Sequence, residues 1–198
     1  MAMERVDRKL TAILAADVVG YSRLMSADQQ GILERVKAYR QEFIYPKIAA
    51  HKGRIVKTTG DSMFAEFPSA IDAVRCAVEA QRAMVARNAQ LPDEQRAAFR
   101  MGINLGDVTV DGDNIYSDGV NIAACLQTLA EPGGIFISRV VRDRIRDKLP
   151  YIFEDRGEHS IKNVARPVGA YAMDGTVIAS LPPVSAMAHA ASTSPTPP

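Results

Sequence analysis

Apolar residues in the first third of the chain follow two different periods. Residues 10–19, LTAILAADVV, form a compact apolar run that predicts a buried strand, and Gly20 ends it. From Ser26, which we take as a helix N-cap, apolar residues recur at helical spacing as far as Pro46. The pattern therefore predicts a strand followed by a helix that stops at Pro46, with a few more helical residues up to Gly53.

The rest of the chain alternates in the same way. The predicted elements are a hairpin at 53–67, a helix at 69–88, a long strand at 99–112, a helix at 120–130, a short strand at 135–138, a short helix at 140–149 and closing strands at 151–161 and 168–173. This order predicts an α+β sandwich, with helices on one face of a mainly antiparallel sheet.

Composition sets the limits of the folded part. The chain has 198 residues, of which 47% are hydrophobic and 24% charged, and this suits one domain with a real core. We expect residues 1–8 to be a disordered lead and residues 9–174 to be the domain. Residues 175–198 are rich in Ala, Ser and Pro, which predicts a disordered tail or linker.

Charge and cysteine content exclude several classes of function. The formal net charge is +1, so nothing favours a nucleic acid polymer or an anionic membrane as partner. No apolar run approaches the ~18 residues of a membrane span, so we expect no membrane segment. Cys76 and Cys125 form no metal-binding or disulfide pattern, which favours reduced thiols and a cytoplasmic location.

Two aspartates carry the first chemical signal. Asp17 ends the apolar strand, and a carboxylate there is costly unless it is paired or bound to a cation. Asp61 lies at the tip of the predicted hairpin, which can lie beside the end of that strand. Either residue alone is explained equally well as a turn aspartate. Together they predict a site for hard divalent cations such as Mg²⁺ on a triphosphate.

Three segments make the signal specific. ILAADVVGYSRLM, KTTGDSMFAEF and NIYSDGVNIAACLQTLAEPGGIFIS resemble, in order and spacing, the signature segments of class III adenylate/guanylate cyclase catalytic domains of the bacterial type. The resemblance covers residues 8–173. It implies a ferredoxin-like α+β unit that forms a head-to-tail homodimer with shared active sites. It also implies that ATP is converted to cyclic AMP and pyrophosphate with two Mg²⁺ or Mn²⁺ ions per site.

The resemblance assigns roles to individual residues. It implies that the metal ligands are Asp17, Asp61 and the carbonyl of Val18. The turn that holds the phosphates would consist of Val19, Gly20, Tyr21 and Ser22. Lys57 would contact the adenine from the opposite subunit, Asn121 would orient the ribose, and Lys162 would contact the triphosphate.

Two positions depart from the family pattern. Cys125 stands where the family has an arginine, one helical turn after Asn121. Loss of such a donor costs on the order of 10²–10³ in rate, and a thiol is a weak donor. Asn114 replaces an aspartate that accepts from the adenine amino group, so adenine preference is loosened and GTP stays open as a substrate.

These departures leave two hypotheses. The first is an adenylate cyclase with reduced activity. The second is a degenerate cyclase homology domain that binds nucleotide and acts as a regulatory or heterodimeric partner, which Cys125 favours. A pure interaction domain would leave the paired aspartates unexplained.

Overall fold

The computed structural model describes residues 7–20, 29–111 and 114–182. Its strands are β1 (Asp7–Val18), β2 (Arg54–Thr59), β3 (Ser62–Phe67), β4 (Phe99–Asp111), β5 (Asn114–Tyr116), β6 (Ile135–Ser138), β7 (Glu154–His159) and β8 (Val168–Met173). Its α-helices are α2 (Gln29–Tyr39), α3 (Tyr45–Ala50), α4 (Ala70–Asn88), α5 (Asp118–Leu129), α6 (Arg139–Ile145) and α7 (Gly175–Ser180). A π-helical turn, η1 (Arg40–Ile44), joins α2 to α3, and a 3-10 turn, η2 (Asp93–Gln95), precedes β4.

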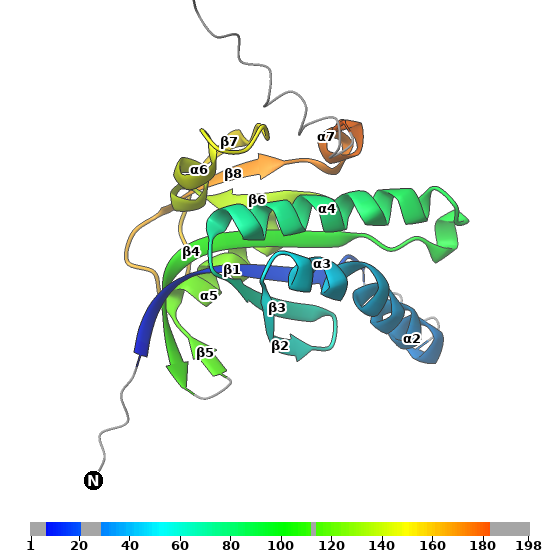
Figure 1. The fold of residues 1–198 in the computed structure, drawn as a ribbon, viewed down its shortest axis with the longest axis horizontal. Helices are drawn as coiled ribbons and strands as arrows, with labels where there is room; N and C mark the ends of the chain where they lie inside the picture. The colour runs from blue at the N-terminus through cyan, green and yellow to red at the C-terminus, as the bar shows by residue number, and fades with distance from the viewer. Residues whose placement is uncertain (1–6, 21–28, 112–113, 183–198) are drawn as a thin grey trace, which may run out of the picture.

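The strands form one sheet in the order β2-β3-β1-β4-β6-β8-β7, with β5 paired to β4 (Figure 1). All pairs are antiparallel except β4 with β6. The predicted α+β architecture with a mainly antiparallel sheet is confirmed. Among the described helices, none is long and apolar enough to cross a bilayer.

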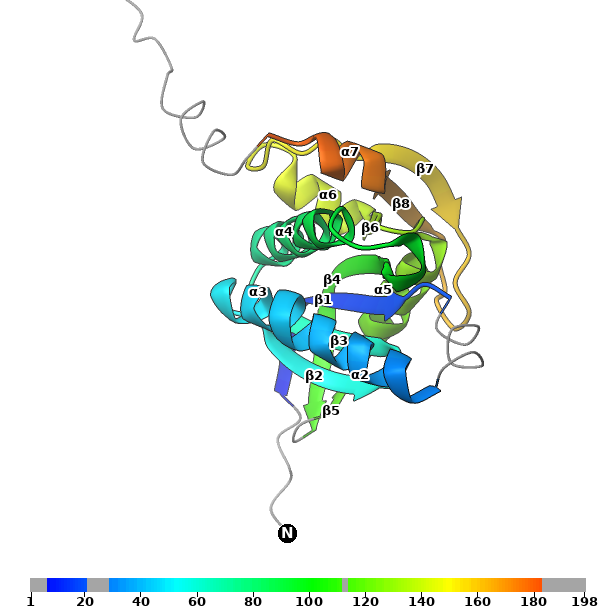
Figure 2. The ribbon, with the colours of Figure 1, turned by 90° about the vertical axis from the view of Figure 1, so that its right-hand side faces the viewer.

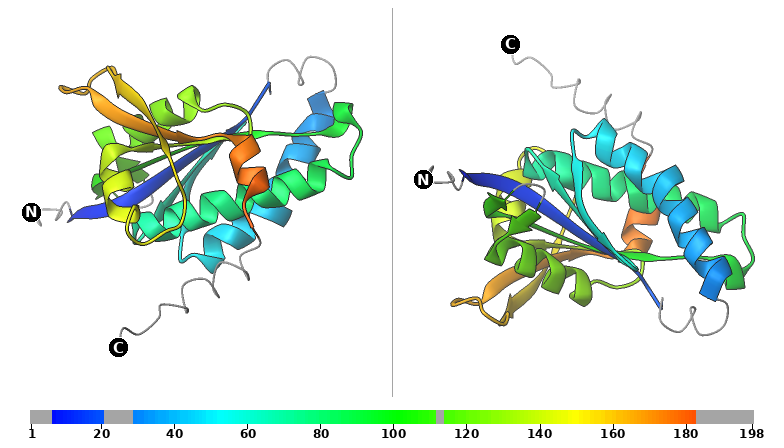
Figure 3. Two further views of the ribbon diagram at one scale, coloured as in Figure 1. Left: turned by 90° about the horizontal axis from the view of Figure 1, so that it is seen from above. Right: turned by 90° about the horizontal axis from the view of Figure 1, so that it is seen from below.

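Helices cover both faces of this sheet, so the prediction of one covered face is wrong. Alternate residues of β1 explain why, because Leu14 belongs to the large core under α2, α3, α4, α6 and α7. Its neighbours Ile13 and Ala15 point the other way and pack with Ala123 of α5. Figures 2 and 3 show α4 and α5 on opposite sides of the central strands. β1 reads as a continuous apolar run because both of its faces are buried.

Close packing fixes α5 on its face of the sheet. Gly102 of β4 lies so near α5 that an added Cβ would overlap the backbone nitrogen of Gln127 and the carbonyl oxygen of Ala123. The helix begins with Ser117, whose hydroxyl accepts a hydrogen bond from the Val120 amide. The Ser117 cap therefore sets where α5 starts, and Gly102 allows it to pack closely on the sheet.

The helix expected to stop at Pro46 loses its α-helical geometry earlier, after Tyr39, and the few helical residues expected up to Gly53 are confirmed as α3. The chain turns through the π-helical η1 and continues as α3, with Pro46 in the first turn of that helix. Proline is tolerated there because its missing N–H would have had no intrahelical partner.

The limits of the domain also differ from those predicted. Asp7 and Arg8, placed in the lead, belong to β1 and pair with β4. The expected tail begins with α7, whose Ile178 is fully buried. Arg82 of α4 donates to the carbonyls of Leu181 and Pro182 at 3.1 and 2.7 Å, so ordered structure extends past Asp174.

Candidate active site

Asp17 and Asp61 meet at the carboxyl end of β1. Asp17 is the second-last residue of β1 and pairs with Ser62 at the start of β3. Asp61 immediately precedes Ser62, in the two-residue turn between β2 and β3. The β1–β3 register therefore brings the two predicted aspartates to neighbouring positions. Asp17 is only 8% exposed, whereas Asp61 is half-buried.

Arg100 binds Asp17 from the neighbouring strand β4. It pairs with Asp17 in the β1–β4 register. Its guanidinium donates two hydrogen bonds to the Asp17 carboxylate, from Nε to Oδ1 at 3.1 Å and from Nη2 to Oδ2 at 2.7 Å. The hydrogen bond to Asp17 is the largest cause of a raised Arg100 pKa, and the charge of Asp61 adds to it. This fork geometry compensates a carboxylate that would otherwise be buried without a partner.

The sequence interpretation missed Arg100. The available signal was a single charged residue inside the apolar strand at 99–105, on the face that alternation shares with Gly102 and Asn104. That signal identifies no partner by itself. Only the β1–β4 register shows that Arg100 faces Asp17.

The phosphate turn that the resemblance implies is described only in part. Val18 pairs with Phe99, and the Val19 amide donates to the Ala98 carbonyl at 2.9 Å. Gly20 follows with φ +73, a conformation that favours glycine. Tyr21 and Ser22 lie outside the described residues.

A second group of predicted residues lies on α5. Asn121 is exposed and Cys125 half-exposed, one turn apart on a helix whose Ala123 and Leu126 are buried against the sheet. The other end of α5 reaches the first group, because Arg100 donates to the Thr128 carbonyl at 3.3 Å. The structure thus aligns Asn121 with Cys125 along one outer surface of α5.

The remaining predicted residues are spread over the sheet. Lys57 is exposed on β2, and its strand partner is Phe64, on the α5 face. Asn114 begins β5 and pairs with Asp111 at the end of β4. Lys162 is exposed in the loop between β7 and β8. In one chain, Asn114 is thus separated from Asp17 by nearly the whole 13-residue length of β4.

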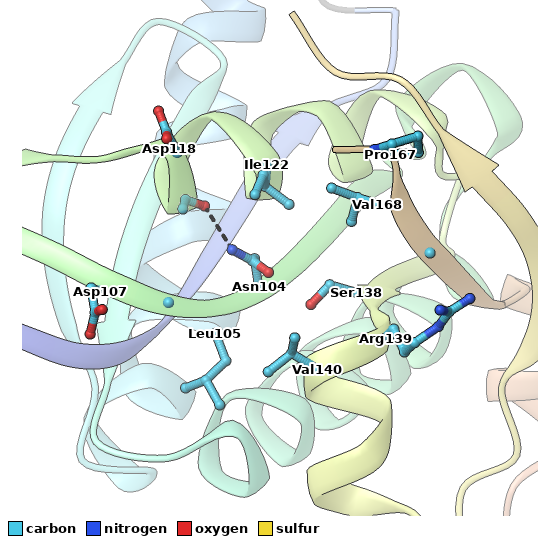
Figure 4. Close-up of a pocket in the computed structure, with 13 residues that line it drawn as sticks. Asn104, Leu105, Asp107, Asp118, Ile122, Ser138, Arg139, Val140, Pro167 and Val168 are labelled. Carbon is cyan, nitrogen blue, oxygen red and sulfur yellow. Dashed lines mark hydrogen bonds between the residues drawn. The ribbon is translucent and has the colours of Figure 1, made fainter. Parts of the chain in front are cut away.

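A cavity of about 410 Å³ lies beside α5, but it contains none of the predicted site residues. It opens where β4 diverges from β6, and Figure 4 shows Asn104 and Ser138 at its centre with the Arg139 guanidinium extending away from them. Its position separates it from the group of Asp17, Asp61 and Arg100.

The match to a family profile decides the identity of the fold. Residues 3–175 match the family described as the adenylate and guanylate cyclase catalytic domain. The chain belongs to this family. The cyclase domain is 44% identical over 168 residues to a putative adenylate cyclase 3 of Rhizobium meliloti (strain 1021), a match that covers 85% of this chain and 29% of the relative. An adenylate cyclase of Streptomyces coelicolor is 30% identical over 143 residues, covering 72% of this chain and 35% of that protein.

Solved structures agree with this assignment. A cyclase from Silicibacter pomeroyi, described as an adenylate/guanylate cyclase/hydrolase, superposes with a TM-score of 0.82 at 44% identity, covering 86% of this chain and 99% of the other. The adenylyl cyclase CyaB of P. aeruginosa shares the fold, with a TM-score of 0.74 at 24% identity and coverages of 85% and 95%. The cyclase domain spans about a third of the length of the two curated relatives.

The donor atoms at the end of β1 fit a divalent cation of the Mg²⁺ or Mn²⁺ kind. Carboxylates and backbone carbonyls are the oxygen ligands that such ions prefer, and Asp17 and Asp61 lie at neighbouring positions. Within the described residues there is no cluster of three or more His, Cys, Asp or Glu side chains suited to a metal. A metal here would therefore depend on two carboxylates, with the remaining ligands from backbone, water or substrate.

Proposed function

We propose that this cyclase domain converts ATP to cyclic AMP and pyrophosphate, in a head-to-tail homodimer that binds two Mg²⁺ or Mn²⁺ ions per site. In this reaction the ribose 3′ oxygen bonds to the α-phosphorus while the bond from that phosphorus to pyrophosphate breaks. Relatives named adenylate cyclase support ATP as substrate, and GTP is the second candidate because Asn114 can donate as well as accept. A cytoplasmic location is part of the same proposal.

The observation that carries this proposal is the convergence of Asp17, Asp61 and Arg100 at one end of β1. Asp17 and Asp61 would hold the metal ions, which supply Lewis acidity to the attacking oxygen and neutralise the triphosphate. Arg100 contacts both oxygens of Asp17, so it orients that carboxylate. A cation that binds Asp17 has to share or displace this arginine.

The spacing of the predicted residues along β4 supports the dimer. Asp17 faces Arg100 at the start of the strand, and Asn114 pairs with Asp111 at its end. The strand has 13 residues, on the order of 40 Å of extended chain before curvature. A nucleotide that uses both groups is easier to place between two chains than within one.

The other predicted residues would contact the nucleotide. Asn121 on α5 would orient the ribose, and Lys57 and Asn114 would contact the purine of the partner's nucleotide. Lys162 would contact its triphosphate, and the turn from Val19 to Ser22 would hold the β- and γ-phosphates. Each of these roles comes from the family resemblance.

The test is an assay of purified protein with ATP or GTP and either Mg²⁺ or Mn²⁺. We expect cyclic AMP, formed faster with Mn²⁺, and a loss of at least roughly 10³-fold in Asp17→Ala and Asp61→Ala. Cyclic GMP as the main product would overturn the substrate assignment. Activity that survives both substitutions would overturn the metal site.

Cys125 favours a second candidate, a degenerate domain that binds nucleotide and regulates a partner. The half-exposed thiol cannot replace a guanidinium as donor to a phosphate. Nucleotide binding without any cyclic product, under all four combinations of nucleotide and metal, would establish this second function in place of the first.

A further inference from the structure

Arg40 is a buried arginine at the first residue of the π-helical turn η1. It is 6% exposed, and among the described residues no carboxylate pairs with it. Arginines are seldom buried without a partner, because removing the guanidinium from water is costly unless its donors are used. Its position therefore calls for an explanation.

The partner of Arg40 is the tip of the β2–β3 hairpin. Its Nη2 donates a 2.8 Å hydrogen bond to the carbonyl oxygen of Gly60, the residue before Asp61. Figures 1 and 2 show the helix that carries it beside this hairpin. The guanidinium thus reaches from the bend between α2 and α3 to the turn that presents Asp61.

The turn itself has few other restraints. The last strand pair is Thr59 with Ser62, so Gly60 and Asp61 lie outside the ladder. Gly60 is exposed, has φ +52 and has open space where a Cβ would be. Among the described residues, Arg40 is the residue whose side chain hydrogen-bonds to this glycine.

Arg40 lies at the start of an irregular, π-helical turn. A π-helical turn inserts an extra residue and is frequent at functional sites. Arg40 and Ile44, four residues apart, are both buried in this turn, so they lie on its inward face.

We propose that Arg40 is a positioning residue for Asp61: by holding the Gly60 carbonyl, it fixes the direction of the Asp61 carboxylate and so sets the affinity of the metal site. The inference rests on the proposed function, in which Asp61 is a metal ligand. Arg40 itself touches neither metal nor substrate.

The test is Mn²⁺ binding, followed by electron paramagnetic resonance, to the folded protein saturated with 3′-deoxy-ATP, which cannot cyclise. Arg40→Met removes the donors and keeps an apolar stem of similar length. We expect its Mn²⁺ dissociation constant to rise roughly 10- to 100-fold, the usual effect of losing a group that orients a metal ligand. Lys37→Met, at an exposed position of α2, is the matched control and should leave the constant unchanged.

A double-mutant cycle separates positioning from general destabilisation. In an Asp61→Ala background, Arg40→Met should have no further effect on Mn²⁺ binding, because its target is gone. An effect that persists there, or unchanged binding in a folded Arg40→Met protein, overturns the role of Arg40. If Arg40→Met does not fold, Arg40→Lys provides the same comparison with one donor retained, and we expect less than a tenfold weakening. Wild-type binding that does not depend on Asp61 overturns the proposed function instead, and this inference with it.

Discussion

The two groups of residues that the proposed reaction needs are held by different forces. At the end of β1, hydrogen bonds fix the site: Arg100 donates to the Asp17 carboxylate, and Arg40 donates to the carbonyl of Gly60, the residue before Asp61. On α5, apolar packing against Gly102 fixes the helix, and Asn121 and Cys125 are displayed on its outer surface. The difference teaches that the first group is arranged within one chain, whereas the second faces outward and is suited to a partner. Of the two departures from the family pattern, Cys125 falls in the second group, and Asn114 on β5 falls in neither.

The most direct test of whether the two groups come from different chains combines two variants, each with a substitution in one group. Asp17→Ala and Asn121→Ala should each be nearly inactive, but mixing them should restore activity. With random exchange, half of the dimers are mixed and each has one intact site of two, so about a quarter of wild-type activity should return. The measurement is cyclic AMP formation after mixing at equal concentrations.

The matched control mixes Asp17→Ala with Asp61→Ala, which damage the same group and should restore nothing. Recovery in the control, or none in the test mixture, would show that the two groups do not come from different chains.

The close packing of α5 against β4 can be tested by adding a single methyl group at Gly102. Gly102→Ala should lower the free energy of unfolding by about 3 kcal/mol, because its Cβ would overlap the α5 backbone. Gly106→Ala is the control, since its Cβ would be 3.6 Å from the nearest side-chain atom and fits. Urea denaturation of both variants gives the comparison, and equal stabilities would refute the close approach.

The hydrogen bonds from Arg100 to Asp17 should contribute less to the free energy of unfolding than the close packing at Gly102. Arg100→Met should lower the free energy of unfolding by about 2 kcal/mol without metal, because it leaves the carboxylate without its charged donor. Added Mn²⁺ should stabilise the variant more than the wild type, since the cation would replace the lost charge. Thermal denaturation with and without Mn²⁺ measures this, and an equal metal effect on both proteins would argue against a metal at Asp17.

A substitution on the outer surface of α5 should have the smallest effect, and it should increase the cyclase rate. Cys125→Arg should raise the cyclase rate roughly tenfold or more, because it restores a cationic donor one turn from Asn121. Initial rates at saturating ATP and Mn²⁺ test this, with Cys76→Ser as a control for the other thiol. An unchanged rate would mean that position 125 does not face the reacting phosphate.

Several residues of the site could be predicted from sequence because their signals are local. The apolar run before Asp17 and the hairpin around Gly60 and Asp61 are read directly from neighbouring residues. The predicted helix at 120–130 likewise placed Asn121 and Cys125 on one helix. These elements and the identity of the two aspartates could be read from neighbouring residues in the chain.

Other features depended on contacts between distant segments. α7 is ordered because Ile178 is buried and Arg82 binds the carbonyls after it, which its Ala- and Ser-rich surroundings do not reveal. Likewise, the π-helical turn η1 between α2 and α3 has no counterpart among the predicted elements. Neither outcome follows from composition or periodicity.

The sequence by itself determined the order of strands and helices, the two aspartates and the unusual Cys125. Tertiary structure decided which residues surround those aspartates. Strand register, a property of pairing between segments 83 residues apart in the chain, sets Arg100 against Asp17. Helix packing sets Arg40 against Gly60, the turn beside Asp61. Both arginines look like ordinary charged residues in the chain, because what defines them is the buried partner that folding brings within reach.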